Sequence, residues 1–267
     1  MGDNETGQVS ADAAKIYDEF YLPALFEEWC PRVVEAAGIR QGQQVVDVAC
    51  GSGVLALKAL EHTGLEGSVV GIDINDGMLK IARSKSTGVK WIKAPAEALP
   101  FVECQFDCVV SQFGLMYFES PELSLREMMR VLRPGGSLAV AVWDSLENNP
   151  GFSAEEILWR QVLGDDAEDE TPYRLGDKQV LETLFDSADI PDIGIDTVSG
   201  AARFASIRSW IHSGAKGWTG DDAFDDDQLE GLLRTAEREL ADFVTPAGEA
   251  AFRTSAHIVS ATKQGNF

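Results

Sequence analysis

The sequence predicts an α/β protein with a doubly wound, mostly parallel sheet of seven strands, together with N-terminal helices and a helical lid. Five short apolar segments rich in β-branched residues, typical of buried parallel strands, alternate with helical segments between residues 45 and 143. The connections are short, and crossovers of this kind join parallel strands. With 267 residues, of which 45% are hydrophobic, the chain is long enough for one large domain that carries an insertion.

Two helices are predicted in residues 10–37, separated near Pro23, with Gly38 as the C-cap of the second. The first strand begins at Val45, and a turn and a helix follow it. Asp76 is the predicted N-cap of a later helix. The other elements of this half are strands at 68–74, 89–94, 106–112 and 137–143 and helices at 77–84 and 121–132.

The turn after the first strand is the part of the chain on which the functional prediction depends. Gly51 and Gly53 permit a sharp turn and a close approach of a ligand to the backbone. The helix that follows, predicted to run through Leu60, directs unpaired N–H groups and its positive dipole end into the turn. Asp47 lies four residues before the first glycine. The helix start attracts an anion and Asp47 attracts a cation, so the pair favours a zwitterionic ligand over a bare phosphate.

The second half predicts a looser arrangement. Helices are expected at 153–163, 177–188, 206–213 and 227–243, strands at 193–197 and 257–262, and acidic loops at 165–170 and 221–227. The helices between the last two strands are too many for a simple connection. We therefore divide the chain into an N-terminal helical segment (1–40), a Rossmann-like core (41–200 with 254–267) and a helical lid (201–253).

Ligands of doubly wound sheets bind beyond the carboxyl ends of the strands. Asp47, Asp73, Ala96 and Gln112 all fall at or just after such ends. Residues 51–56 also fit the dinucleotide pattern G-x-G-x-x-G/A, and Asp73 stands twenty residues beyond Gly53, where a dinucleotide site needs an acid for the ribose. An NAD-binding oxidoreductase is therefore one alternative, but Asp47 would place a negative charge close to the pyrophosphate.

Several motifs resemble those of class I S-adenosylmethionine-dependent methyltransferases. Residues 47–53, 71–74, 94–101 and 106–112 resemble the first four motifs of that family, in the expected order. Residues 130–136 resemble the turn before the fifth strand in its small-molecule branch, which includes the quinone-biosynthesis C-methyltransferases. The resemblance covers residues 43–143 and is weak over the helical lid, where substrates are chosen.

The resemblance implies S-adenosylmethionine as the cofactor and S-adenosylhomocysteine as its product. Asp73 would bind both ribose hydroxyls, and Asp47 would lie near the ammonium group. Many relatives carry Asp where this chain has Pro95, so Glu97 or a backbone carbonyl is expected to replace that contact to the adenine. The residues predicted to bind the cofactor are Asp47, Ala49, Cys50, Gly51, Gly53, Asp73, Ile74, Met78, Ala96, Glu97 and Gln112.

Methyl transfer from a sulfonium is an in-line displacement that alignment and exclusion of water can accelerate, so no conspicuous acid or base is required. Tyr17 and His212 are the candidate catalytic residues, and ordinary packing is the alternative for each. The candidate substrate pocket consists of Tyr17, Tyr117, Trp143, Trp210 and His212. The prediction is a methyltransferase for a small-molecule acceptor. Besides the NAD-binding enzyme, a non-catalytic S-adenosylmethionine-binding protein remains an alternative.

The net charge of −22 disfavours nucleic acid as a partner, because such a surface repels phosphate backbones. Salt adaptation and a cationic substrate both remain open as explanations of this charge. The four cysteines and three histidines show no metal-binding spacing, so no metal is expected. Without an apolar run long enough for a membrane span or a signal peptide, the expected location is the cytoplasm.

Overall fold

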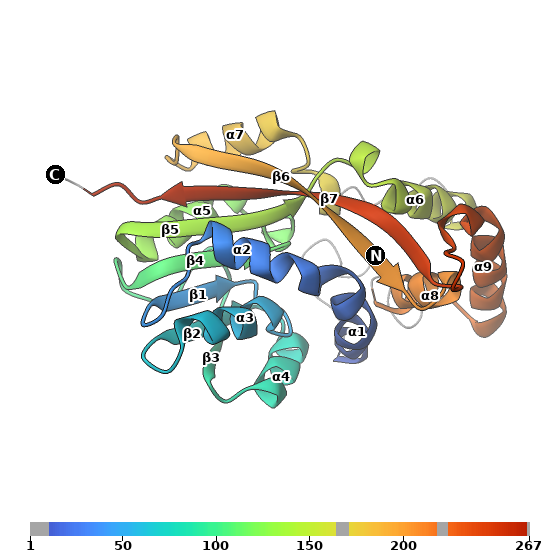
Figure 1. The fold of residues 1–267 in the computed structure, drawn as a ribbon, viewed down its shortest axis with the longest axis horizontal. Helices are drawn as coiled ribbons and strands as arrows, with labels where there is room; N and C mark the ends of the chain where they lie inside the picture. Colours follow the sequence, from blue (N-terminus) through green and yellow to red (C-terminus); the bar gives the residue numbers. More distant parts are fainter. Residues whose placement is uncertain (1–10, 164–170, 218–223, 266–267) are drawn as a thin grey trace.

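A seven-stranded sheet with the order β3-β2-β1-β4-β5-β7-β6 forms the centre of the computed structural model (Figure 1), which describes residues 11–163, 171–217 and 224–265. β1 pairs in parallel with β2 and β4, as do β2 with β3 and β4 with β5, whereas β7 is antiparallel to β5 and β6. The predicted doubly wound sheet is confirmed. The strands are β1 (Gln44–Val48), β2 (Ser68–Asp73), β3 (Val89–Lys93), β4 (Phe106–Gln112), β5 (Leu132–Trp143), β6 (Ile193–Phe204) and β7 (Ala250–Thr262).

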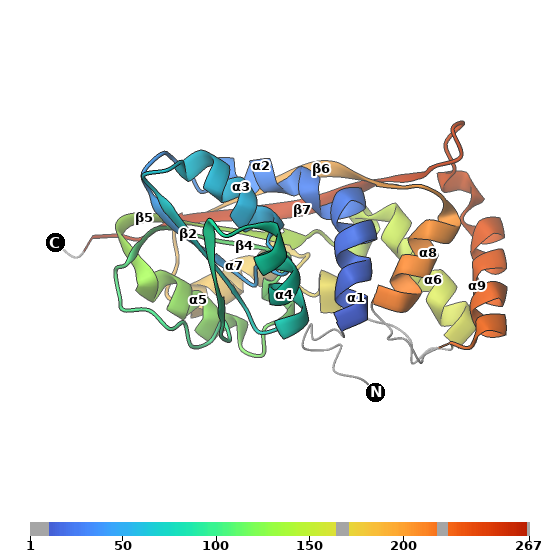
Figure 2. The ribbon, with the colours of Figure 1, turned by 90° about the horizontal axis from the view of Figure 1, so that it is seen from below.

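Helices cover both faces of this sheet, as a doubly wound fold requires. Figure 2 shows α2 (Cys30–Ala36) and α3 (Val54–Thr63) on one face and α5 (Pro121–Val131) and α7 (Lys178–Ser187) on the other. Because both faces are covered, the central strands β1 and β4 are largely buried, and Val45, Val46, Val109 and Val110 have no exposed surface, whereas the edge strands β3 and β6 are partly exposed. The carboxyl ends of β1, β2 and β4 lie at one edge, where Asp47 is level with Gly71 on one side and Val110 on the other.

The N-terminal segment differs from the prediction of two helices separated at Pro23. Helical turns continue through the proline in a π-helical segment, η2 (Tyr17–Phe26), between α1 (Ala11–Ile16) and a short 3-10 turn, η3 (Glu27–Trp29). Proline lacks an N–H and its ring collides with the carbonyl four residues earlier, and the wider π turn accommodates both effects without ending the helix. The C-cap of α2 is Ala37 and not the predicted Gly38, which follows it in the left-handed conformation (φ +61°), and the Ile39 N–H donates to the Val34 carbonyl (3.2 Å).

The helix after β2, α4 (Asp76–Lys85), also corrects a prediction. Its N-cap is Asn75 and not Asp76, because the Asn75 side chain accepts the hydrogen bond of the Met78 N–H (3.0 Å). Asp76 is the first helical residue, where its negative charge still favours the positive end of the helix dipole.

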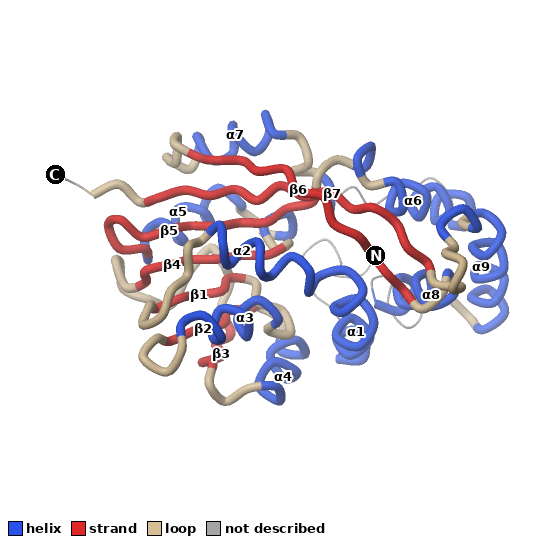
Figure 3. The backbone as a smooth tube through the Cα atoms, in the orientation of Figure 1, coloured by secondary structure: helices blue, strands red, loops and turns tan. Residues whose placement is uncertain are grey.

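The second half of the chain builds long strands and a group of helices at one end of the molecule. β6 and β7 run past the other strands to α8 (Ile207–Gly217) and α9 (Asp226–Glu239), and α6 (Pro150–Leu163) lies nearby (Figures 1 and 3). Both strands are longer than predicted, because twelve residue pairs from Ile193↔Ala261 to Phe204↔Ala250 stay in register. Short 3-10 turns are η4 (Leu115–Tyr117), η5 (Leu146–Asn148), η7 (Thr171–Tyr173) and η8 (Ala241–Phe243).

Some predictions concern residues outside this description. The acidic loop at 165–170 lies outside the described residues, as do the first three residues of the predicted loop at 221–227. The division into three domains stays a prediction. Within the described ranges, no helix combines the length and the apolar character that crossing a membrane requires.

Candidate functional site

The turn between β1 and α3 is built from backbone in the left-handed region. Ala49, Gly51 and Gly53 have φ values of +59°, +52° and +92°. A Cβ on Gly51 would meet no atom within 4 Å, so this side of the turn is open for a ligand. The backbone strain at Ala49, which is not a glycine, is a feature typical of functional sites.

A second strained residue lies beside the first. Phe113, directly after β4, has φ +54°, and β4 is the parallel neighbour of β1. A Cβ on Gly114 would lie 2.6 Å from the Cβ of Ala49, so the two turns are in direct contact. Two non-glycine residues in left-handed conformation therefore meet at the carboxyl edge of the sheet, where doubly wound folds bind ligands.

The indole of Trp91, on β3, explains why the chain needs glycine at positions 53 and 71. A Cβ on either glycine would lie 2.4 Å from a carbon of the Trp91 ring. The ring is held by its Nε1, which donates a hydrogen bond to the Ser86 carbonyl (3.1 Å). The ring therefore packs against both the turn and β2, and it supports the turn from the side of β3.

Asp73, at the end of β2, ties the turn to the neighbouring strand. Its Oδ2 accepts the Gly51 N–H (2.8 Å) and its Oδ1 accepts the Asn75 N–H (2.7 Å). Burial raises the pKa of Asp73 and these backbone N–H groups oppose the rise. Each carboxylate oxygen has two lone pairs, so both retain acceptor capacity for a ligand.

Asp47 is buried without compensation. It is 1% exposed, and neither carboxylate oxygen has a hydrogen-bond partner among the described residues. Burial raises the pKa of Asp47 well above its usual value. The Ala56 backbone N–H opposes the rise although it does not reach hydrogen-bond geometry, and the nearby Asp73 adds to the rise. An uncompensated buried carboxylate is costly unless a cation pairs with it. The site is therefore suited to a ligand with a positive group.

Beside β2, an apolar surface continues from Asp73. Ile74 is 46% exposed, which is unusual for isoleucine, whereas Met78 and Ala96 are buried. Glu97 is directed toward α5, since its Oε1 accepts the Ser120 N–H (3.2 Å). Ile74 thus offers an open apolar surface of the kind on which a flat ring packs.

The N-terminal segment closes over the turn. Asp18, on η2, pairs with Lys85 from the end of α4, and the Lys85 ammonium lies 3.4 Å from the Ser52 hydroxyl in the turn. On the other side, the Gln112 Nε2 donates to the Phe26 carbonyl (3.1 Å), which joins the end of β4 to η2. The site is therefore assembled from segments that are far apart in the sequence.

An aromatic cluster continues the site beyond β4 and β5. Phe113 and Trp143 stack with their ring centroids 3.9 Å apart, and Phe152, on α6, contacts Trp143 (5.3 Å) and Tyr173 (5.7 Å). Tyr173 keeps accessible surface although burial raises its pKa well above the usual value.

The predicted pocket residues Tyr17 and Tyr117 share this environment. Tyr17 is half-buried, burial raises its pKa, and the next largest cause is the charge of Tyr117, followed by Cys30 and Asp73. Tyr17, Tyr117 and Tyr173 are each only partly accessible, and the space that these three side chains border is hereafter called the recess. The charges of Tyr117 and Asp73 both act on Tyr17, so this set adjoins the end of β2.

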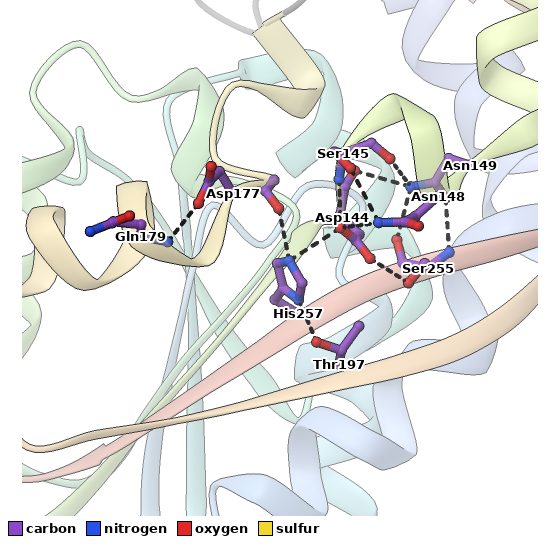
Figure 4. Close-up of polar contacts among 10 residues, drawn as sticks. Asp144, Ser145, Asn148, Asn149, Asp177, Gln179, Thr197, Ser255 and His257 are labelled. Carbon is purple, nitrogen blue, oxygen red and sulfur yellow. Dashed lines mark hydrogen bonds and ion pairs between the residues drawn. The ribbon is translucent and has the colours of Figure 1, made fainter.

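A hydrogen-bond network holds the segment that carries Tyr173 (Figure 4). The His257 Nε2 lies 2.9 Å from the Gly176 carbonyl and 3.3 Å from the Asp144 Oδ1, and its Nδ1 lies 3.0 Å from the Thr197 hydroxyl. Because both neighbours of Nε2 are acceptors, Nε2 carries a proton. His257 therefore fastens this segment to β6 and β7.

The same network fixes Asp144 at the end of β5. Its Oδ2 accepts the Ser255 hydroxyl (2.7 Å), its Oδ1 accepts the Ser145 N–H (2.8 Å), and Asn149 bridges to the Ser255 backbone (Figure 4). Burial alone would raise the pKa of Asp144. The hydrogen bonds that it accepts outweigh burial, and the pKa is lowered. The charge of His257 is the smallest of the causes that lower it. With its polar atoms satisfied, this network positions residues.

Two predicted pocket residues lie on α8. Trp210 is fully buried and packs against Phe252 with ring centroids 4.5 Å apart, and His212 is exposed on the same helix. The Trp210 Nε1 donates to Glu155 (2.9 Å), a buried carboxyl that the sequence did not single out. The substrate-pocket roles of Trp210 and His212 stay predictions.

Glu155 and Tyr173 were missed in the sequence. For Glu155 a signal exists, since it falls on the apolar stripe of α6 between Phe152 and Trp159. For Tyr173 none does, because its position depends on the His257 network. Among the described residues, no group of three or more His, Cys, Asp or Glu side chains is placed to hold a metal ion.

Comparison with known proteins gives a consistent result. The model of the ubiE/COQ5 methyltransferase family matches residues 9–163. The ubiquinone/menaquinone biosynthesis C-methyltransferases UbiE of Edwardsiella ictaluri and Serratia proteamaculans are 44% and 43% identical to the chain over 118 residues, which are 42% of this chain and 47% of each relative. The chain thus spans about half the length of these relatives.

Solved structures share the fold. The YcgJ protein of Bacillus subtilis is 17% identical with a TM-score of 0.60, over 90% of this chain and 99% of its own. A putative methyltransferase of Bacillus halodurans is 18% identical with a TM-score of 0.61, over 88% and 99%. At this level of identity the likeness concerns the fold, and it extends over most of the described elements.

Proposed function

Because the chain belongs to the ubiE/COQ5 methyltransferase family, whose model matches residues 9–163, we propose that it transfers the methyl group of S-adenosylmethionine to a small-molecule acceptor. The observation that carries this proposal is the pairing of an open glycine turn with the uncompensated carboxylate of Asp47. A zwitterionic amino-acid group matches both, since its ammonium would pair with Asp47 and its carboxylate with the N–H groups of the turn. A pyrophosphate would instead place negative charge beside Asp47, which disfavours NAD.

Each part of the cofactor has a matching residue. Asp73 would accept the two ribose hydroxyls with the lone pairs that Gly51 and Asn75 leave available. Ile74 and Met78 would pack on the adenine, and the Ala96 backbone would contact its edge. Since Glu97 accepts the Ser120 N–H, we assign the contact to the adenine amine to a backbone carbonyl. The bound cofactor would supply an electrophilic methyl group on a sulfonium.

The residues of the recess indicate an aromatic acceptor. Tyr17, Tyr117 and Tyr173 border it, and Phe152 joins Tyr173 to the stacked pair of Phe113 and Trp143. The UbiE relatives are named for ubiquinone and menaquinone biosynthesis, and quinol rings of this kind fit an aromatic recess. The protein would act by aligning the acceptor in line with the methyl group and by excluding water. We propose that the lid helices α8 and α9 close this recess.

Calorimetric titration with S-adenosylmethionine, S-adenosylhomocysteine and NAD tests the cofactor assignment. Wild type is expected to bind both adenosyl ligands and not NAD. Asp73→Ala removes two hydrogen bonds to a charged acceptor, each worth about 1.5–3 kcal/mol, so the affinity is expected to fall by about 100-fold or more. Asp76→Ala is the matched control, because this exposed acid lies three residues away and outside the turn.

The outcomes separate the alternatives. Binding of NAD alone would contradict the proposal and support an oxidoreductase. Binding of the adenosyl ligands without transfer of labelled methyl to 1,4-naphthohydroquinone, the acceptor probe, would support a non-catalytic binding protein or a different acceptor. Incorporation of label, lost in Asp73→Ala and kept in Asp76→Ala, is the expected result.

A further inference from the structure

A single charged side chain interrupts the buried stripe of α6. Phe152, Glu155 and Trp159 follow each other at helical spacing and are 5%, 9% and 9% exposed. Phe152 contacts Trp143 and Tyr173 in the aromatic cluster, and Glu155 lies one turn further along the same face. A buried glutamate is retained only where it is hydrogen-bonded or used.

The surroundings of Glu155 are shaped to hold its carboxyl group. The Trp210 Nε1 donates to its Oε2 (2.9 Å). On the same helix, a Cβ on Gly214 would stand 2.9 Å from the Glu155 Oε1 and 3.1 Å from the Tyr21 hydroxyl. Glycine inside a helix costs about 1 kcal/mol relative to alanine, and here it makes room for the carboxyl and the hydroxyl. Three elements, η2, α6 and α8, therefore converge on this carboxyl.

Glu155 is also placed to exchange a proton near neutral pH. Burial raises the pKa of Glu155 to about 8, the charge of Glu156 on the same helix adds to the rise, and the indole N–H groups of Trp210 and Trp159 oppose it. The other titratable groups that face it are Tyr21 on η2 and Tyr173 on η7.

Tyrosine side chains link the surroundings of Glu155 with those of the glycine turn. Tyr21, which lies beside Glu155 at Gly214, stacks on Tyr17 with ring centroids 6.4 Å apart. The charges of Tyr117 and Asp73 act on Tyr17, and those of Glu155 and Tyr117 act on Tyr173. Asp73 and Glu155 therefore both adjoin this group of tyrosines.

We propose that Glu155 is the proton acceptor of the reaction, an inference that rests on the proposed function. The hydroxyl proton of the acceptor passes to the Glu155 carboxylate, and the electron pair of that O–H bond stays on the acceptor. The acceptor then forms a bond to the methyl carbon, the methyl–sulfur bond breaks, and its electron pair goes to sulfur. Trp210 stabilises the ionised carboxylate before the transfer and Tyr173 lies on the acceptor side of it.

The pH dependence of methyl transfer to 1,4-naphthohydroquinone is one test. Wild type is expected to gain rate as pH rises through about 8, where Glu155 ionises. Glu155→Gln is expected to lose this rise of the rate with pH. Its rate is expected to fall by about 100-fold, the lower end of what general acid–base catalysis contributes. Glu156→Gln, the same change at the next position, is expected to keep the rise of the rate with pH. The rise is expected at lower pH than in wild type, because the Glu156 charge raises the Glu155 pKa.

A binding experiment without turnover separates catalysis from structure. 1-Naphthol, whose neutral and ionised forms differ in absorption, is added to each variant saturated with S-adenosylhomocysteine. Over a pH range in which free naphthol stays neutral, its affinity is expected to rise through about pH 8 in wild type, where the ionised Glu155 accepts the naphthol O–H, and to be independent of pH in Glu155→Gln. Glu156→Gln is expected to keep this rise at lower pH, and Trp210→Phe, which loses an N–H that lowers the Glu155 pKa, is expected to show it at higher pH.

Each result bears on one of the two proposals. If wild type fails to bind S-adenosylhomocysteine, the proposed function fails. If it binds S-adenosylhomocysteine but the affinity for naphthol is independent of pH in wild type, or rises equally in Glu155→Gln, the role of Glu155 is overturned while the proposed function stands. An affinity of Glu155→Gln for S-adenosylhomocysteine within twofold of wild type would show that the variant is folded.

Discussion

The contact of Trp91 with Gly53 and Gly71 gives a quantitative prediction for the glycine turn. Gly71→Ala inserts a methyl group 2.4 Å from the ring, and Gly53→Ala does the same at a residue that also has φ +92°. The first variant therefore tests overpacking alone, and the second adds the cost of a left-handed conformation. Gly135→Ala is the matched control for that cost, because φ is +78° there and its Cβ would meet nothing within 4 Å.

The expected magnitudes follow from these distances. Overpacking in a well-packed site costs about 1–3 kcal/mol, and a left-handed conformation costs a residue with a Cβ about 1–2 kcal/mol. Gly135→Ala is thus expected to lower the free energy of unfolding by about 1 kcal/mol, Gly71→Ala by about 2 and Gly53→Ala by about 3. The ring cannot move away without losing the hydrogen bond from its Nε1 to Ser86.

Urea unfolding measures these changes in the free energy of unfolding. Each of the three variants is made both in the wild-type background and in a Trp91→Ala background. Without the ring, Gly71→Ala is expected to cost about 0.5 kcal/mol or less, while Gly53→Ala keeps about 1 kcal/mol from its backbone conformation. An unchanged cost of Gly71→Ala in the Trp91→Ala background would refute the reasoning, because the clash would then lie elsewhere. Equal costs for Gly53→Ala and Gly135→Ala in wild type would refute it as well.

Substitutions at two further positions test buried polar groups. Asp47 has a raised pKa in the folded protein, so its stabilising contribution is complete below its unfolded value of 3.8 and is lost as pH rises through the folded value. Asp47→Asn is therefore expected to stabilise the ligand-free protein by about 1–3 kcal/mol at pH 7 and little below pH 4, by urea unfolding, while S-adenosylhomocysteine binds more weakly. His257→Phe removes the donor to the Gly176 carbonyl and one of the donors to Asp144, which keeps those of Ser255 and Ser145, and it is expected to cost about 1–3 kcal/mol in the same assay, whereas His257→Gln keeps a donor and should cost about half as much. A less stable Asp47→Asn at pH 7, or equal losses in the two His257 variants, would contradict these expectations.

The arrangement of the glycine turn with Asp47 and Asp73 could be predicted because its signals are local. The glycine turn, Asp47 and Asp73 stand at fixed distances along the chain, and the sheet brings the ends of β1, β2 and β4 to one edge. The predictions failed where two adjacent residues competed for one role. Asn75 and Asp76 both suit an N-cap, and only the extended backbone of Asn75 decides between them.

The acceptor side could not be predicted to the same extent, because its signals are not local. β6 contains Gly194, Gly200 and several small residues, so its length depends on pairing with β7 and not on its own propensity. Tyr173 reaches the recess only because Gly176 is held by His257, 81 residues away. A proline is a helix breaker in most contexts, and the π turns around Pro23 depend on the packing of Tyr21 and Phe26.

The two halves of the site also differ in where the chain encodes them. The family match ends at residue 163, and it includes all the predicted cofactor residues and Glu155. The groups that hold Glu155 and Tyr173 in place, namely Trp210, Gly214 and His257, all follow that point. A change in the later part of the chain therefore alters the hydrogen bond to the Glu155 carboxyl or the position of Tyr173 without touching the turn that Asp73 and Gly51 form. Under the proposed function, acceptor choice would therefore depend on the segment after residue 163 and cofactor binding on the segment before it.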